Sequence, residues 1–482
     1  MTTNEENPQP VPGGPAREQH RHRARVVVLA VTATAALAAG TVSAVGAHAD
    51  ANPGGRYSGT LADGATWIAD VPADWNGALL VYSHGFGPLV AQNAPDPNTA
   101  AALLAEGYAL AGSSYDPGGS QWALLSAVRD QLETIEAVKA TVLPTAPERV
   151  IAVGSSMGGL VTALLAEQGA GRIDGALSTC GIVAGAVNLN QYQLNGEWAL
   201  ARLLPGVRNV QLVNFDPANP FAPFATAAAL TAAAAQAQET PQGRARLALA
   251  LAFLNVAPWD ASLTESASAN DPVAFETAQY KVLFDGPFNT LAFLMFARPS
   301  LEAAAGGNSS GTIGVNFAAV LNTSPYKRVV TQLYQDAGLD LAADLAILTA
   351  DADIAAEPAA IASLTSSSVP TGHLDVPMLS VHTVSDQLVP VQMEDFYAQR
   401  VREAGSNSLL RQAYVSAVGH CNFSPAELVA SVHAIEYRIA TGHWAKVATA
   451  ASLQSSATSL NLGPGRFIDY RPGNLTGAVI VP

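Results

Sequence analysis

Three short segments carry residue types that together suit nucleophilic catalysis. Ser156 stands in the run GSSMG, Asp386 in SDQLVP and His420 in VGHC. A serine hydroxyl is a weak nucleophile at neutral pH, so a base must take its proton. Histidine has the pKa for that task, and a carboxylate on its other ring nitrogen fixes the tautomer and stabilises the imidazolium. The three segments therefore predict a Ser156–Asp386–His420 triad.

The residues around Ser156 fit a sharp turn from a strand into a helix. Residues 149–153 form a mostly apolar run of strand length, and leucine and valine recur at helical spacing after Gly158. Glycines two positions before and after the serine remove Cβ atoms that would clash in such a turn. The backbone N–H of Met157 would then face any negative charge that forms beside Ser156. An ordinary loop between strand and helix is the alternative.

Other acids and histidines are less well placed for this chemistry. Asp375 precedes a predicted strand, and Glu394 and Asp395 lie in the helical pattern that follows it. His433 lies within a predicted helix, and His443 follows that helix at the far end of the sheet. Position in the chain therefore favours Asp386 and His420.

The elements that must position these residues alternate as in a parallel sheet. After a hairpin at 56–72, strands are predicted over 79–83, 108–113, 149–153, 173–179, 377–382 and 410–417, with helices over 121–141, 158–169 and 425–441. This alternation predicts an α/β fold, with a mostly parallel central sheet covered by helices. Such sheets place their sites at the carboxyl ends of the strands, where all three triad candidates stand. His84 and Tyr115 also follow strands and are candidate substrate-binding residues, with packing over the oxyanion hole as the alternative for His84.

The alternation stops between residues 183 and 370, where the chain is rich in alanine and helical in pattern. We interpret this segment as a helical cap inserted into the sheet domain. The predicted organisation is a signal peptide over 1–49, the core over 50–182, the cap over 183–370, the rest of the core over 371–445 and an extension over 446–482. The extension, which ends with a late Val-Ile-Val, is expected to be irregular with one strand.

Composition and the N-terminus limit the possible partners. The chain has 482 residues, 49% of them hydrophobic, and a formal net charge of -15. So acidic a protein is not expected to bind nucleic acid or anionic membrane surfaces. Residues 26–47 carry no charge, follow several arginines and precede Ala47-His48-Ala49, which predicts a cleaved secretory signal peptide and a secreted protein. An uncleaved membrane anchor is the alternative, because the apolar run is long enough to span a bilayer.

The motifs, in this order, resemble those of the α/β-hydrolase superfamily over roughly residues 56–182 and 371–441. The His-Gly loop at 84–85, the Gly-x-Ser-x-Gly turn, the Asp-x-x-Val-Pro segment and the Gly-His segment carry the resemblance. It implies the α/β-hydrolase fold, the Ser156–Asp386–His420 triad and oxyanion donors at Met157 and Phe86. It also implies that residues 183–370 are the lid. This chemistry requires neither a metal nor a cofactor.

The chain has two cysteines, Cys180 and Cys421. An even number in an exported protein predicts a disulfide, and two separate buried thiols are the alternative. Cys421 directly follows His420, which is similar to the tannase and feruloyl-esterase group, where such a cysteine ties the histidine loop to the nucleophile region. The partner cysteine of that group precedes the serine, where this chain has Ser155. Cys180, at the end of the neighbouring strand, would take the partner's place.

These features predict a secreted serine hydrolase that cleaves carboxylic esters, in a small-molecule or polymeric substrate, through an acyl-enzyme intermediate. Cleavage of an amide or peptide bond is the alternative, because both reactions pass through one kind of tetrahedral intermediate. A non-catalytic secreted binding protein ranks lower, because all three triad residue types are present.

Overall fold

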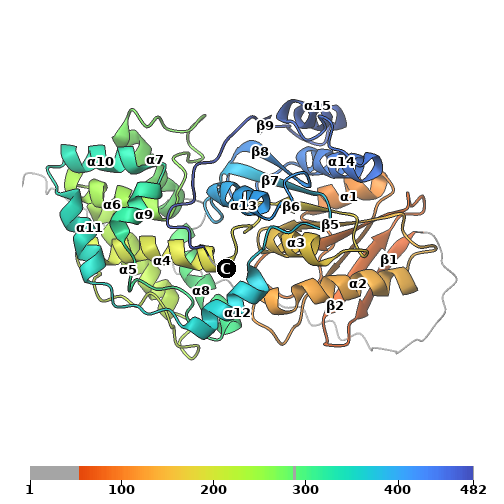
Figure 1. Ribbon diagram of the computed structural model, residues 1–482, viewed down its shortest axis with the longest axis horizontal. Coiled ribbons are helices and arrows are strands. Elements are labelled where there is room, and N and C mark those ends of the chain that lie inside the picture. The colour runs from red at the N-terminus through yellow and green to blue at the C-terminus, as the bar shows by residue number, and fades with distance from the viewer. Residues whose placement is uncertain (1–53, 286–288, 481–482) are drawn as a thin grey trace, which may run out of the picture. The chain divides into compact units, whose positions relative to one another are not determined.

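The computed structural model describes residues 54–285 and 289–480 (Figure 1). The predicted signal peptide and its cleavage site lie outside these residues. Within the two described ranges, no helix is both long and apolar enough to cross a membrane.

The described residues form a nine-stranded mixed sheet in the order β1-β2-β4-β3-β5-β6-β7-β8-β9. Its strands are β1 (Gly55–Thr60), β2 (Thr66–Val71), β3 (Ala78–Ser83), β4 (Ala109–Ser113), β5 (Arg149–Ser155), β6 (Gly175–Thr179), β7 (Met378–Ser385), β8 (Leu410–Val418) and β9 (Phe467–Ile468). From β4 to β8 all neighbours are parallel, and β1, β2 and β9 are attached antiparallel. The exchanged order of β3 and β4 beside a parallel run is the topology of the α/β-hydrolase fold, which confirms the predicted fold class.

Helices cover both faces of the sheet, as the apolar character of the central strands requires (Figure 1). Successive side chains of β3 alternate between two cores: Leu79 and Val81 pack in one, and Leu80 packs in the other. The first core includes residues of α2 (Ala127–Thr141), α3 (Met157–Gln168) and α13 (Gln392–Glu403), and the second includes residues of α1 (Pro97–Ala105), α14 (Pro425–Thr441) and α15 (Ala450–Leu460).

Between β6 and β7 the described residues form helices and no strand. These helices are α4 (Ala186–Leu203), α5 (Ala222–Ala237), α6 (Pro241–Phe253), α7 (Pro272–Phe284), α8 (Thr290–Ala305), α9 (Phe317–Thr323), α10 (Lys327–Asp336), α11 (Leu341–Ala350) and α12 (Pro358–Ser368). We call this helical segment the cap. Its core is built around α4 and α6: Trp198 of α4 is buried and donates its indole N–H to the carbonyl of Leu348 at 3.1 Å.

The C-terminal extension contains one strand, as predicted, and a helix that was not predicted. The short strand β9 pairs with the edge strand β8, and the helix α15 precedes it. Val479 and Ile480 lie outside this strand. Val479 donates its backbone N–H to the side chain of Asn188 at 2.6 Å, and Ile480 is 84% exposed.

Candidate active site

Ser156 lies in a strained turn between β5 and α3. Its backbone has φ 61° and ψ -123°, which is unusual for a residue with a side chain. A Cβ on Gly154 would lie 2.1 Å from the carbonyl oxygen of Gly158, and a Cβ on Gly158 would lie 1.9 Å from that of Ser83. Both glycines are therefore required by close backbone contacts, as the sequence pattern predicts.

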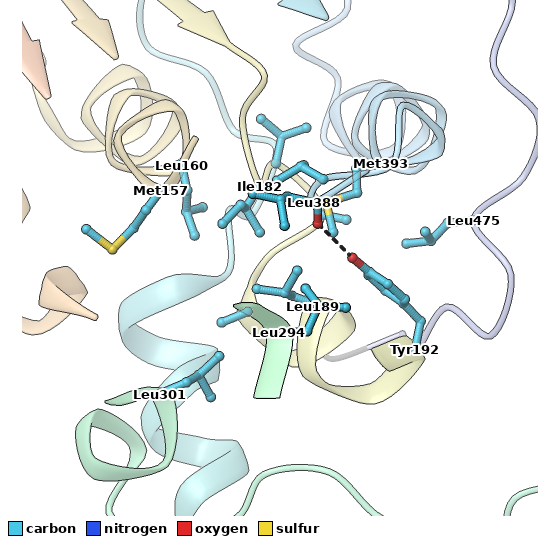
Figure 2. Close-up of a cluster of buried hydrophobic side chains, with 14 of the residues drawn as sticks. Met157, Leu160, Ile182, Leu189, Tyr192, Leu294, Leu301, Leu388, Met393 and Leu475 are labelled. Carbon is cyan, nitrogen blue, oxygen red and sulfur yellow. Dashed lines mark hydrogen bonds between the residues drawn. The ribbon is translucent and has the colours of Figure 1, made fainter. Parts of the chain in front are cut away.

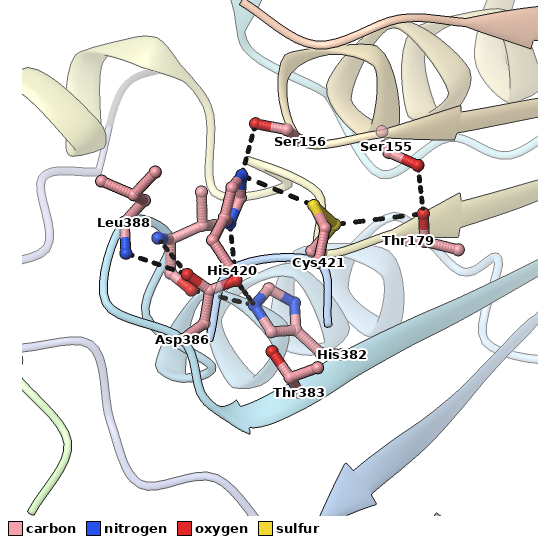
Figure 3. The surroundings of a disulfide bond; sticks show 12 residues. Ser155, Ser156, Thr179, His382, Thr383, Asp386, Leu388, His420 and Cys421 are labelled. Carbon is pink, nitrogen blue, oxygen red and sulfur yellow. Dashed lines mark hydrogen bonds and ion pairs between the residues drawn. A yellow bond between two sulfur atoms is a disulfide. The ribbon is translucent and has the colours of Figure 1, made fainter. Parts of the chain in front are cut away.

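The structure brings Ser156, His420 and Asp386 into one hydrogen-bonded chain (Figure 3). Ser156 Oγ lies 2.8 Å from His420 Nε2, and His420 Nδ1 lies 2.7 Å from Asp386 Oδ2. The other carboxylate oxygen of Asp386 accepts the backbone N–H groups of Leu388 and Val389, each at 2.9 Å. With Nδ1 donating to the carboxylate, Nε2 is left to accept the proton of the serine hydroxyl.

The surroundings of Asp386 favour its charged form. Burial by itself would raise the pKa of this carboxyl group, but the charge and hydrogen bond of His420, the charge of His382 and the N–H of Val389 outweigh it. The pKa of Asp386 is therefore lowered, and the group is ionised at neutral pH. A carboxylate in this position stabilises the imidazolium that forms on His420 when it accepts a proton.

Two backbone N–H groups next to Ser156 can stabilise an oxyanion. Met157 is the first residue of α3, and Phe86 follows Gly85 in the loop after β3. A Cβ on Gly85 would lie 3.2 Å from the Cβ of Ser156, so the glycine lets this loop approach the serine closely. Within residues 54–285 and 289–480, neither the N–H of Met157 nor that of Phe86 donates to a protein acceptor. Both donors are available for a ligand.

A cavity of about 350 Å³ lies beside Ser156 and His420, between the core loops and the cap. Its wall is mostly apolar and includes Phe86, Trp122, Ile182, Leu189, Phe293, Leu294, Leu301, Leu388 and Val389. Figure 2 shows five of these residues, Ile182, Leu189, Leu294, Leu301 and Leu388, converging from α4, α8 and the loops after β6 and β7. Tyr192 of α4 donates its hydroxyl to the carbonyl of Leu388 at 3.3 Å, which ties the cap to the loop that carries Asp386.

The side chains of His84, in the loop after β3, and of Tyr115 are buried and do not line this cavity. Their rings stack with centroids 4.2 Å apart, and the Tyr115 hydroxyl donates to the carbonyl of His84 at 3.0 Å. Burial lowers the pKa of His84. Both side chains are buried, which for His84 corresponds to the packing alternative, and a contact of either residue with substrate stays a prediction.

Aromatic side chains connect Phe86, in the loop after β3, to the surface of the cap. The ring of Phe86 meets those of Phe293 and Phe296 of α8 edge to face, with centroids 5.9 and 6.3 Å apart. Phe296 in turn stacks on Phe224 of α5 at 5.5 Å. Phe296 and Phe224 are 39% and 43% exposed. This aromatic row, Phe86–Phe293–Phe296–Phe224, runs from the cavity wall to the surface.

The predicted disulfide is present: Cys180 and Cys421 are bonded, with Cα atoms 5.3 Å apart (Figure 3). The bond joins the end of β6 to the residue after His420. Cys180, His420 and Cys421 have potential metal-ligand atoms within 4.8 Å of one another. Because both sulfurs are bonded, they are not available as thiolate ligands.

The sequence interpretation missed a buried polar pair behind Asp386. His382 Nδ1 lies 3.2 Å from Glu394 Oε1, and His382 Nε2 lies 2.9 Å from the carbonyl of Val389. Both side chains are fully buried. The available signal was a histidine at the end of a mostly apolar predicted strand, four residues before the candidate acid.

Comparisons with known proteins give one curated relative. No family model matches the chain. The chain is 30% identical over 412 residues to the o-phthalyl amidase of Xanthobacter agilis, which covers 80% of this chain and 87% of that protein. Among solved structures, feruloyl esterase B of Aspergillus oryzae is similar with 13% identity, coverage of 80% of both chains and a TM-score of 0.39. An acylaminoacyl peptidase of Pyrococcus horikoshii is similar with 9% identity, coverage of 76% of this chain and 37% of that chain, and a TM-score of 0.32. The fold assignment rests on the strand order above.

Proposed function

Because the chain belongs to the family of the o-phthalyl amidase of Xanthobacter agilis, we propose that it is a secreted serine hydrolase that cleaves amides and esters of aromatic carboxylic acids. The observation that carries the proposal is the hydrogen-bonded chain Ser156–His420–Asp386 at the wall of an apolar cavity. The enzyme class agrees with the sequence prediction of a serine hydrolase of the α/β-hydrolase fold.

The proposed reaction has two halves. Ser156 Oγ attacks the substrate carbonyl carbon while its proton moves to His420 Nε2, and the N–H groups of Met157 and Phe86 stabilise the oxyanion. His420 then passes the proton to the leaving nitrogen or oxygen, which leaves an acyl group on Ser156. In the second half, His420 takes a proton from water, the resulting attack releases the carboxylic acid, and Ser156 regains its proton.

The sequence favours an ester substrate, whereas the relative is named for an amide. Amides and esters differ in the leaving group: an amine must be protonated before it departs, whereas an alcohol departs more readily. A histidine held at 2.7 Å by a buried carboxylate is suited to deliver that proton. We therefore propose the amide as the physiological bond, with the corresponding esters cleaved as well.

The shape of the cavity supports an aromatic acyl group of a small molecule. A volume of about 350 Å³ bounded by leucine, isoleucine and phenylalanine suits one substituted ring better than a polymer. Phe86 and Phe293 present ring edges and faces with which an aromatic acyl group can pack. Gln193 and Asn190 add amide groups to the wall for a polar substituent.

Two features support secretion. The residues before Asp50 have the pattern of a cleavable signal peptide, and the Cys180–Cys421 disulfide suits an oxidising compartment.

The test compares Ser156→Ala with Ser155→Ala. Ser155 is the neighbouring serine, but its hydroxyl is paired with that of Thr179 at 2.8 Å. The substrates are 4-nitroanilides and 4-nitrophenyl esters of acetic, benzoic and 2-carboxybenzoic acid. We expect Ser156→Ala to lower the rate about 10⁶-fold and to abolish labelling by an organophosphonate, whereas Ser155→Ala keeps both. We also expect benzoyl or 2-carboxybenzoyl substrates to exceed acetyl ones in kcat/KM. Labelling of another serine, or an unlabelled protein that binds these acids without turnover, would refute the proposal.

A further inference from the structure

We propose that His382 is a positioning residue, a buried imidazolium that holds Asp386 in place and shares its carboxylate with His420. The inference rests on the proposed role of the Ser156–His420–Asp386 chain and goes beyond it by adding a group that touches neither serine nor substrate. His382 is the last-but-three residue of β7, and Asp386 directly follows that strand.

The contacts of His382 connect it to the triad. One carboxylate oxygen, Asp386 Oδ2, lies 2.7 Å from His420 Nδ1 and 3.7 Å from His382 Nε2. The side chains of His382 and Asp386 are fully buried, so water does not screen this pair. In Figure 3 the two imidazoles of His382 and His420 both approach the carboxylate of Asp386.

The hydrogen-bond partners of His382 indicate that its ring carries two protons. Its Nε2 faces the carbonyl of Val389 at 2.9 Å, which can only accept a hydrogen bond. Its Nδ1 faces Glu394 Oε1 at 3.2 Å. Glu394 already receives the hydroxyl of Ser380 at 2.8 Å on the same oxygen and the amide of Gln412 at 2.6 Å on the other, which suits an ionised carboxylate. With an acceptor at each nitrogen, one of them a carboxylate, the ring of His382 suits an imidazolium.

His84 provides the contrast within the same molecule. It too is buried and faces two backbone carbonyls, but one of them is 3.4 Å away, and neither nitrogen faces a carboxylate. Burial lowers the pKa of His84. For His382, burial also opposes the charge, but the hydrogen bond and charge of Glu394, the charge of Asp386 and the Val389 carbonyl outweigh it and raise the pKa.

The charged groups around His382 come from three elements. Glu394 faces it from α13, Asp386 from the loop after β7, and His420 from the loop after β8 through Asp386. The neutral Gln412 and Ser380 complete the shell around Glu394 from β8 and β7. The nearest anion to His382 Nε2 is therefore the carboxylate that His420 also uses.

The shared carboxylate connects His382 to the reaction. When His420 accepts a proton, two cations share the charge of Asp386, so the imidazolium of His420 is stabilised less than it would be beside Asp386 alone. Without the cation at position 382 this stabilisation would be stronger, and the pH dependence of the reaction would change.

The test measures the pH dependence of kcat/KM with a fixed 4-nitrophenyl ester for three variants. In His382→Asn we expect the acid limb to move to higher pH by about one unit, with a loss of less than about tenfold on the alkaline plateau. In His382→Asn/Glu394→Gln, which replaces the ion pair by two amides, we expect a smaller upward shift. The control is His433→Asn, which replaces a partly exposed histidine of α14 paired with Glu106 and should leave the limb unchanged.

The possible outcomes separate this inference from the proposed function. If neither His382→Asn nor the double variant moves the acid limb of the pH profile while the melting temperature falls, His382 is only structural and the inference is overturned. If Ser156 is not labelled in the unaltered protein, the proposed function fails instead. Should both variants fail to fold, the ¹⁵N signals of the histidine rings in the unaltered protein decide. The ring assigned to His382 is expected to be doubly protonated at pH 7, and a neutral ring at pH 7 overturns the inference.

Discussion

Cys421 directly follows His420 and is bonded to Cys180. Cys180 directly follows β6, the neighbour of the strand β5 that ends just before Ser156. The loop that holds the proposed base is thereby attached to the part of the sheet that holds the proposed nucleophile. The Ser156–His420 distance of 2.8 Å is thus supported by a covalent link close to it.

Opening this disulfide is expected to lower activity before it lowers secondary structure. The bond closes a loop with a sequence separation of 241, for which the chain-entropy model gives up to ~5 kcal/mol of stabilisation. In Cys180→Ser/Cys421→Ser we expect kcat/KM to fall, together with the free energy of unfolding measured in denaturant. Activity and far-UV circular dichroism would be followed together during mild reduction. Two alkylated cysteines in the unreduced protein would contradict the bond itself.

Replacing Asp386 by asparagine is expected to lower kcat about 10⁴-fold with little change in fold, because the wrong tautomer of His420 is then favoured.

The lowered pKa of Asp386 also affects the pH dependence of the free energy of unfolding. A carboxyl group whose pKa is lower in the folded state stabilises the fold above its unfolded pKa, near 3.8, and that contribution disappears as the pH falls through the folded value. Acid unfolding of Asp386→Asn should lack this component, and an identical acid transition in both proteins would contradict it.

Glu276→Gln in the cap is expected to stabilise the protein at alkaline pH. Burial raises the pKa of Glu276 to about 7, against the opposing effects of Gln238 and Arg244. A carboxyl group with a raised folded pKa costs stability fully above that pKa and costs little below its unfolded pKa of 4.5. We expect a gain on the order of 1–3 kcal/mol at pH 8 and almost none at pH 4.5. A loss at pH 8 would show that the ion pair with Arg244 outweighs the cost of burial.

The aromatic row is expected to select the leaving group. In Phe296→Ala and Phe224→Ala, kcat/KM should fall severalfold for anilides and aryl esters, because their rings lose a stacking surface. It should change little for methyl esters of the same acid. Tyr437→Ala is the control, since Tyr437 is 39% exposed but lies on α14. Equal losses for aryl and methyl leaving groups would assign these phenylalanines to cap stability instead.

Maturation is expected to remove residues 1–49. The Ala47-His48-Ala49 pattern predicts that the exported protein begins at Asp50. N-terminal sequencing or intact-mass measurement of the secreted protein checks this. An intact N-terminus on membrane-associated protein would favour the anchor.

Local sequence predicted much of the core. The strand-to-helix turn at Ser156 depends on two glycines and an apolar strand, features that neighbouring residues carry. Asp386 and His420 could be selected because each follows a predicted strand, and parallel strands bring their carboxyl ends to one edge. The capping box at Ser424 and Glu427 likewise fixes the start of α14 at the position the pattern predicts. The helix α15 of the extension was harder to predict, because its alanine- and serine-rich segment has only two leucines as large apolar residues.

Tertiary structure alone decided which distant groups meet. Whether His84 lines the cavity or supports a loop depends on the stacking of Tyr115, about thirty residues away, and sequence periodicity carries no information about such a contact. The row from Phe86 to Phe224 joins a core loop to two cap helices, and His382 of β7 meets Glu394 only because α13 packs back against the sheet. Spacing along a chain determines the face on which a side chain lies, whereas packing between elements determines what that face touches.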